Sequence, residues 1–138
     1  MSFLLDTNAV SEWVKPCPNP GLIGWMELAD EDRVFLSVIS LAEVRYGIER
    51  LSVGARRNRL ERWLRDELPL RFEGRVLPID NTVAEAWGRT VSRSEALGRP
   101  MDAMDAFLAA TAEVHRLTLV TRNVSDFPTL KSVVNPWQ

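Results

Sequence analysis

The sequence is poor in the residues that form disulfides, zinc sites and imidazole-based catalytic sites. Among its 138 residues there is one cysteine, Cys17, and one histidine, His115. A single cysteine excludes an internal disulfide and a zinc site of several thiolates, so nothing points to an oxidising compartment. A single histidine excludes metal-free RNA cleavage by two imidazoles acting as acid and base.

Long apolar runs are also absent. No stretch approaches the roughly 20 consecutive apolar residues of a membrane span, and the start SFLLDTN lacks the basic residues and cleavage site of a secretory signal. We therefore expect a soluble, cytoplasmic protein with no membrane partner. The net charge of −2 argues against a protein that coats nucleic acid by bulk attraction. Hydrophobic residues make up 46% of the chain, enough for the core of a single domain spanning residues 1–138.

Short apolar runs rich in Val, Ile, Leu and Phe predict strands with helical patterns between them. The predicted strands are residues 3–5, 34–39, 76–79, 117–121 and, more weakly, 132–134. Asn19, Ser40 and Asp102 are expected at helix N-termini, and Pro69 near the end of a helix that begins after Gly54. Parallel strands need helical crossovers, so this alternation predicts an α/β fold, a three-layer sandwich with a central parallel sheet.

Acidic residues follow three of the predicted strands. Asp6 ends the run FLL, Glu43 lies one helical turn after VFLSVI, and Asp126 follows LTLVT by a short turn. Asp105 lies in the first turn of its helix, three residues after Asp102. Ligands of open α/β sheets bind outside the carboxyl ends of the strands, so we expect these carboxylates to share one crevice.

Each carboxylate also has a structural interpretation. Asp6 could cap a helix, Ser40 with Glu43 matches a capping box, and Asp126 could brace a turn. Asp102 with Asp105 resembles a second capping box. Together, however, unpaired carboxylates repel one another, and a divalent cation relieves that repulsion. Oxygen ligands without a Cys/His cluster suit Mg²⁺, or Mn²⁺ as a substitute.

At these residues the sequence resembles the PIN-domain family, and within it the VapC-type toxins of type II toxin–antitoxin pairs, including the FitB-like branch. The resemblance runs from Phe3 to Trp137 through LLDTN, SVISLAEVRYGIERL, MDAFLAATA, LVTRNVSDF and the ending NPW. It implies a PIN-like α/β/α sandwich, a homodimer and a toxin that is a Mg²⁺-dependent endoribonuclease. It also implies a VapB-like antitoxin partner that blocks the site.

The resemblance assigns catalysis and metal binding to four carboxylates. Asp6, Glu43 and Asp105 match the first three acidic positions of the family. Asp126 matches the fourth and least uniform position, where Asn123 could share or replace its role. The residues expected to support the ligands or contact phosphate, with turn and cap roles as the alternative, are Thr7, Asn8, Thr121, Arg122 and Asn123.

The implied reaction is in-line attack of metal-activated water on phosphorus, which leaves 5′-phosphate and 3′-hydroxyl ends. Whether one or two metal ions take part stays open, as does the identity of the RNA. The segment from residue 45 to residue 75 contains nine arginines and five acidic residues. Arg56, Arg57 and Arg59 are candidate RNA contacts, because arginine binds phosphate and stacks on bases; a solvated helix face and an antitoxin contact are the alternatives.

Three other functions fit the acidic pattern less well. A HAD-type phosphatase needs a second aspartate where this chain has Asn8. A receiver domain needs an acidic pair after the first strand and a lysine at a late strand, whereas the only lysines are Lys15 and Lys131. The remaining alternative is a catalytically silent binding module whose crevice engages a regulatory peptide.

Overall fold

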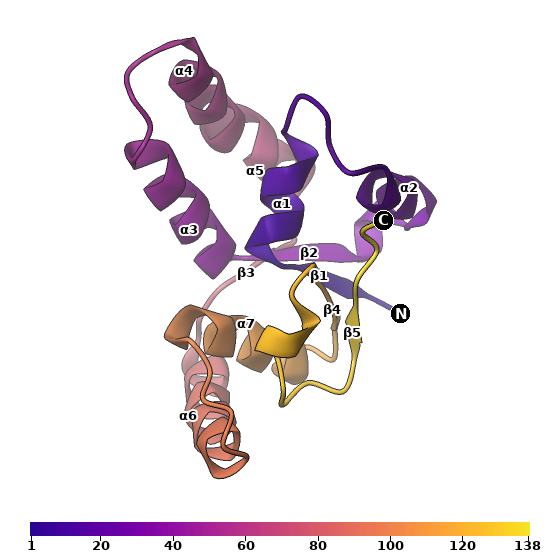
Figure 1. Ribbon diagram of the computed structural model, residues 1–138, viewed down its shortest axis with the longest axis vertical. Coiled ribbons are helices and arrows are strands. Elements are labelled where there is room, and N and C mark those ends of the chain that lie inside the picture. Colours follow the sequence, from indigo (N-terminus) through magenta and orange to yellow (C-terminus); the bar gives the residue numbers. More distant parts are fainter.

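The chain folds around a five-stranded parallel sheet in the computed structural model, which describes residues 1–138 (Figure 1). Its strands are β1 (Phe3–Leu5), β2 (Val34–Ser37), β3 (Val76–Leu77), β4 (Thr118–Val120) and β5 (Val133–Val134). They lie in the order β3-β2-β1-β4-β5, and every neighbouring pair is parallel. Because β1 is central, the residue that follows it lies in the middle of the sheet's carboxyl edge.

Helices occupy the connections between the strands. They are α1 (Thr7–Trp13), α2 (Pro20–Leu28), α3 (Val38–Glu49), α4 (Ala55–Arg62), α5 (Leu68–Arg71), α6 (Asn81–Ala96) and α7 (Ala103–Val114). Two short 3₁₀ turns, η1 (Glu31–Arg33) and η3 (Val124–Asp126), and a π-helical segment, η2 (Trp63–Glu67), complete the chain. None of the helices combines the length and the apolar character needed to cross a bilayer.

The two faces of the sheet carry separate cores, because neighbouring residues of a strand point in opposite directions. Leu5 belongs to a cluster with residues of α1, α2 and α5, among them Val10 and Leu68. Leu4 belongs to a second cluster, which Leu108 of α7 shares. Helix α6 packs on the outside of α7. Figure 1 shows α1 to α5 on one side of the sheet and α6 and α7 on the other, which confirms the predicted three-layer sandwich.

The connection between β2 and α3 differs from the prediction. The strand ends at Ser37 and the helix begins at Val38, so the expected strand to residue 39 and the helix start at Ser40 are wrong. Val38 and Ile39 are β-branched and apolar, which favours a strand, but the Oγ of Ser37 accepts a hydrogen bond from the Ile39 backbone N (3.0 Å) and caps the helix there. Ser40 is therefore not a cap, and the interpretation of Ser40 and Glu43 as a capping box is wrong.

Pro69 lies near the end of the helical chain that begins after Gly54, which confirms the prediction. The helical chain continues through α4, η2 and α5 to Arg71. Proline has no N–H to donate, and a proline inside a helix clashes with the carbonyl of the preceding turn. The chain accommodates it by widening into the π-helical segment, in which the Leu68 N–H donates to the Trp63 carbonyl.

The end of the chain rests on the start of α2, and this contact yields a stability prediction. A Cβ on Gly21 would clash with the carbonyl oxygen of Pro136 and lie 2.8 Å from the Gln138 backbone N, whereas Gly24 has open space. We expect Gly21→Ala to lower the free energy of unfolding by about 1–3 kcal/mol through overpacking. The matched change Gly24→Ala should leave it unchanged or raise it by about 0.5–1 kcal/mol. Urea denaturation measures both, and equal midpoints would contradict the contact.

Candidate active site

Asp6 is the central residue of the acidic crevice. It follows β1 directly, is buried, and continues the sheet by donating its backbone N–H to the Val120 carbonyl (2.9 Å). Its Oδ1 accepts from the Thr7 backbone N (2.6 Å), which makes Asp6 the N-cap of α1. Its Oδ2 accepts from the Thr121 hydroxyl (2.7 Å) and from the Asn8 side chain (3.3 Å). Capping and site formation are thus roles of the same carboxylate.

Glu43 is held in the crevice by Thr7. The Thr7 Oγ1 donates to Oε1 of Glu43 (2.6 Å) and lies 3.1 Å from the hydroxyl of Ser40, which is completely buried. These contacts link α1 to α3 and orient the glutamate. Ser40 was missed as a site residue, although it lies one helical turn before Glu43 on the same face of α3, because its spacing to Glu43 also fits a capping box.

Thr121 connects β4 to the same network. Its hydroxyl donates to Asp6 and accepts from the Asn8 side chain (3.3 Å) and from the backbone N of Asn123 (3.0 Å). The Asn8 Oδ1 accepts from the Arg122 backbone N (3.4 Å). Thr7, Asn8 and Thr121 therefore support the site through their side chains, whereas Arg122 and Asn123 do so through backbone N–H groups and expose their side chains.

Asp105 and Asp126 face a cleft of about 530 Å³ beside this network. Asp102 lines the cleft as well and caps α7, accepting from the backbone N of Met104 (2.9 Å) and of Asp105 (3.4 Å). The predicted cap is confirmed, but only half of a capping box forms, because the Asp105 side chain returns no hydrogen bond. Asp126 ends the turn η3 and is exposed. The cleft residues are Arg99, Pro100, Met101, Asp102, Asp105, Ser125, Asp126 and Pro128.

Repulsion among the carboxylates and burial shape the protonation of the site. The pKa of Asp105 is raised to about 7, first by burial and then by the negative charges of Asp6, Asp102, Asp126 and Glu43. Burial also raises the pKa of Asp6, although the hydrogen bonds from Thr121 and Thr7 oppose the shift. None of the four carboxylates matched to the family pairs with an arginine or lysine.

The ligand chemistry of the crevice fits a hard divalent cation. Its donors are carboxylate and hydroxyl oxygens, the ligands of Mg²⁺ and Mn²⁺. No three Asp, Glu, His or Cys side chains converge closely enough to enclose an ion by themselves. This arrangement suits Mg²⁺, which keeps several of its waters and is usually bound through one or two carboxylates.

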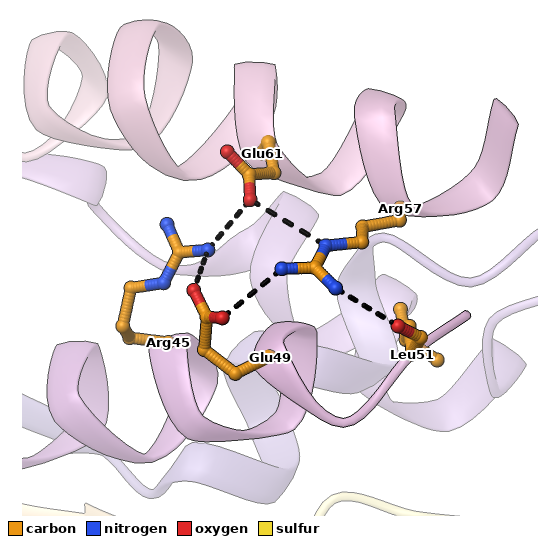
Figure 2. A network of polar contacts seen from close by, with 5 residues as sticks. All are labelled: Arg45, Glu49, Leu51, Arg57 and Glu61. Carbon is orange, nitrogen blue, oxygen red and sulfur yellow. Dashed lines mark hydrogen bonds and ion pairs between the residues drawn. The ribbon is translucent and has the colours of Figure 1, made fainter. Parts of the chain in front are cut away.

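Arg57, one of the three arginines considered as RNA contacts, lies in an ion-pair network between α3 and α4 (Figure 2). Its guanidinium donates to Glu49 (3.0 Å) and to the Leu51 carbonyl (3.0 Å) and lies 3.7 Å from Glu61. Arg45 donates to both glutamates at 2.7 Å, and its hydrogen bond to Glu61 is the main cause of the lowered pKa of that carboxyl. The contacts of Arg57 are therefore internal to the protein.

Arg56 and Arg59 occupy a different face of α4. Both are exposed and take part in no ion pair or hydrogen bond. Arg59 lies three residues after Arg56, and Arg62 lies three residues further on. Residues at this spacing share one side of a helix. The structure therefore divides the arginine-rich segment into a paired inner face and a free outer face.

The raised pKa of Asp105 predicts a pH-dependent stability in the metal-free protein. The folded state holds this proton more tightly than the unfolded chain, so the stabilisation is complete below the ordinary pKa of 3.8 and is lost as the pH rises through about 7. Asp105→Asn should therefore raise the melting temperature in EDTA at pH 8 by about 2–4 °C, since solvent screening limits the effect, and should change it little at pH 4. Exposed Asp32, changed to Asn, is the control. An equal effect of Asp105→Asn at both pH values would contradict the assignment.

Comparison with known proteins identifies the family of the chain. The PIN domain pattern matches residues 3–130. Toxin FitB of Neisseria gonorrhoeae is 40% identical over 136 residues, 97% of each chain, and VapC ribonuclease Y4jK of Sinorhizobium fredii is 30% identical over 136 residues, 98% of this chain and 97% of the relative. The crystal structure of FitAcB from Neisseria gonorrhoeae superposes with a TM-score of 0.91 at 37% identity and covers 99% of both chains. With its parallel sheet and its acidic residues beyond the strand ends, the chain belongs to the PIN domain family.

Proposed function

We propose that this PIN-domain protein is the toxin of a toxin–antitoxin pair and acts as an endoribonuclease. The observation that carries the proposal is the crevice in which Asp6, Glu43, Asp105 and Asp126 gather without cationic partners. Relatives that match almost the whole chain support it, since one is named a toxin and another a ribonuclease. A cognate VapB-like antitoxin and a second copy of the chain are the partners that we expect.

The crevice is the proposed magnesium site. Asp6, Asp105, Glu43 and Asp126 would hold the ion, one or two of them by direct contact and the others through its bound waters. A bound Mg²⁺ or Mn²⁺ would supply a water of lowered pKa and would neutralise charge that develops on the phosphate. Asp105 must lose its proton before it can act as a ligand, and its pKa of about 7 makes metal affinity fall as the pH drops below neutrality.

Two threonines would keep the carboxylates in place during the reaction. Thr121 fixes one oxygen of Asp6, and Thr7 fixes Oε1 of Glu43. The other oxygen of Glu43 takes part in no hydrogen bond within the protein, so it is free to accept one from the attacking water. Attack on phosphorus with departure of the ribose 3′ oxygen leaves 5′-phosphate and 3′-hydroxyl ends.

The exposed face of α4 is the proposed path of the RNA. Arg56 and Arg59 carry free guanidinium groups there, and arginine suits both phosphate and unpaired bases. Arg57 has no such freedom, because its guanidinium is bound to Glu49 and Leu51. We therefore restrict the RNA-contact proposal to Arg56 and Arg59.

The central test is cleavage of total cellular RNA by purified, antitoxin-free protein with Mg²⁺, followed by sequencing of the new 5′ ends. We expect discrete cuts that vanish in EDTA and fall at least about 100-fold in Asp6→Asn, because the substitution removes a proposed metal ligand. Glu85→Gln, on the exposed face of α6, is the matched control and should cut like wild type. Identical cuts by wild type and Asp6→Asn would refute the assignment and favour a binding module.

The arginine proposal is tested by the salt dependence of RNA binding. Arg56→Ala and Arg59→Ala should each weaken binding of a cleavage-site oligonucleotide and reduce the slope of log affinity against log salt by about 0.7, the value for one phosphate contact on a single strand. Asp6→Asn protein without metal prevents cleavage during the titration. Arg57→Ala should instead lower thermal stability and leave the slope unchanged. If Arg57→Ala alone reduced the slope, the assignment of the two helix faces would be reversed.

A further inference from the structure

A second cavity of the protein lies beside the amino ends of β4 and β5. Its volume is about 670 Å³, within the range of small-molecule sites. Leu117, just before β4, and Ser132, just before β5, line it, so it opens at the amino ends of these strands. The crevice of Asp6 lies at the carboxyl ends. The cavity and the cleft of Asp105 and Asp126 adjoin at Pro128, which lines both, but none of their charged side chains is shared.

The walls combine an apolar floor with a basic rim. Leu97, Ala112, Leu117 and Leu130 contribute the apolar surface, and Arg93, Glu113, Arg116 and Lys131 the charged groups. Three cations thus face one carboxylate, in a chain with a net charge of −2.

Only one of the three cations is neutralised within the protein. The Arg93 guanidinium donates to both oxygens of Glu113, at 2.8 and 2.9 Å. Arg116 and Lys131 form no ion pair and no side-chain hydrogen bond. The cavity consequently presents two free positive charges beside apolar surface, a combination that suits an anionic ligand with an apolar body.

The backbone at Arg116 gives an independent reason to regard its side chain as functional. The residue has φ +55, whereas the other two residues with positive φ are Gly74 and Gly98. It ends α7 in the left-handed conformation, with the Leu117 N–H bonded to the Ala112 carbonyl (2.8 Å), and glycine is favoured at this position. An arginine is thus held at the mouth of the cavity at a cost in conformational energy, and such strain collects at ligand sites.

We propose that this cavity binds a nucleoside monophosphate group, with the base on the apolar floor and the phosphate against Arg116 and Lys131. Arginine offers a planar pair of donors that matches phosphate oxygens, and lysine adds a point charge. The hydroxyl of Ser132, 2.7 Å from that of Thr118, lies at the wall as a further polar group. The group could be a free mononucleotide or the 5′-phosphorylated end of an RNA.

The proposal is tested by titrating the metal-free, full-length protein with AMP and following backbone amides by NMR. Saturable shifts at residues 112–117 and 128–132, with a Kd below about 1 mM, are expected. Adenosine and inorganic phosphate should each bind at least tenfold more weakly. A 5′-phosphorylated tetra-adenylate that binds more tightly than AMP identifies an RNA end, and equal or weaker binding identifies a free nucleotide. Absence of shifts, shifts confined to the Asp6 crevice, or equal binding of phosphate alone would overturn the proposal.

Substitutions at Arg116 separate the charge from the backbone strain. Arg116→Asn, which tolerates positive φ, should weaken AMP binding at least fivefold, whereas Arg116→Lys should stay within about twofold of wild type. Arg116→Gly should weaken binding as Arg116→Asn does and raise the melting temperature by about 2–4 °C through relief of strain. Arg89→Gln, on α6 outside the cavity, is the control. Wild-type affinity in Arg116→Asn would contradict the site even if the nuclease proposal holds.

Discussion

The buried carboxylate of Asp6 is the point on which sheet, helix and crevice all depend. Burial penalises its charge, and three donors compensate: the Thr7 amide, the Thr121 hydroxyl and the Asn8 side chain. These donors come from α1 and from the end of β4, so the hydrogen bonds that stabilise the carboxylate also fix the positions of two elements. Local structure and ligand geometry cannot be varied independently at this residue.

Much of the architecture follows from hydrophobic pattern. The runs at residues 3–5 and 117–121 predicted β1 and β4 because a buried parallel strand reads as a continuous apolar segment. The same rule misplaced the end of β2, because Val38 and Ile39 have strand propensity while the preceding serine caps a helix. Propensity is local, and here the cap and the packing of Ile39 on the second core determined the outcome.

Sheet geometry made it possible to predict which carboxylates share the crevice. The hydrogen bonds between the residues of the crevice could not be predicted. Carboxyl ends of parallel strands meet at one edge, so Asp6 and Asp126 had to approach each other. The Thr7 hydroxyl donates a hydrogen bond to Glu43, a residue 36 positions later in the sequence. Spacing between nearby residues cannot reveal such a contact. The arginine-rich segment shows the same limit, because counting charges could not separate the paired Arg57 from the free Arg56.

The two outermost strands have a consequence for how the molecule associates. β3 and β5 contribute two residues each, so the sheet exposes few unpaired backbone groups at either edge. Short edge strands give another chain little template for pairing and thereby protect against aggregation. The longer strands lie inside, flanked on both sides. Extension of the sheet is therefore a poor route to assembly for this chain, and the helices offer the larger surfaces for association.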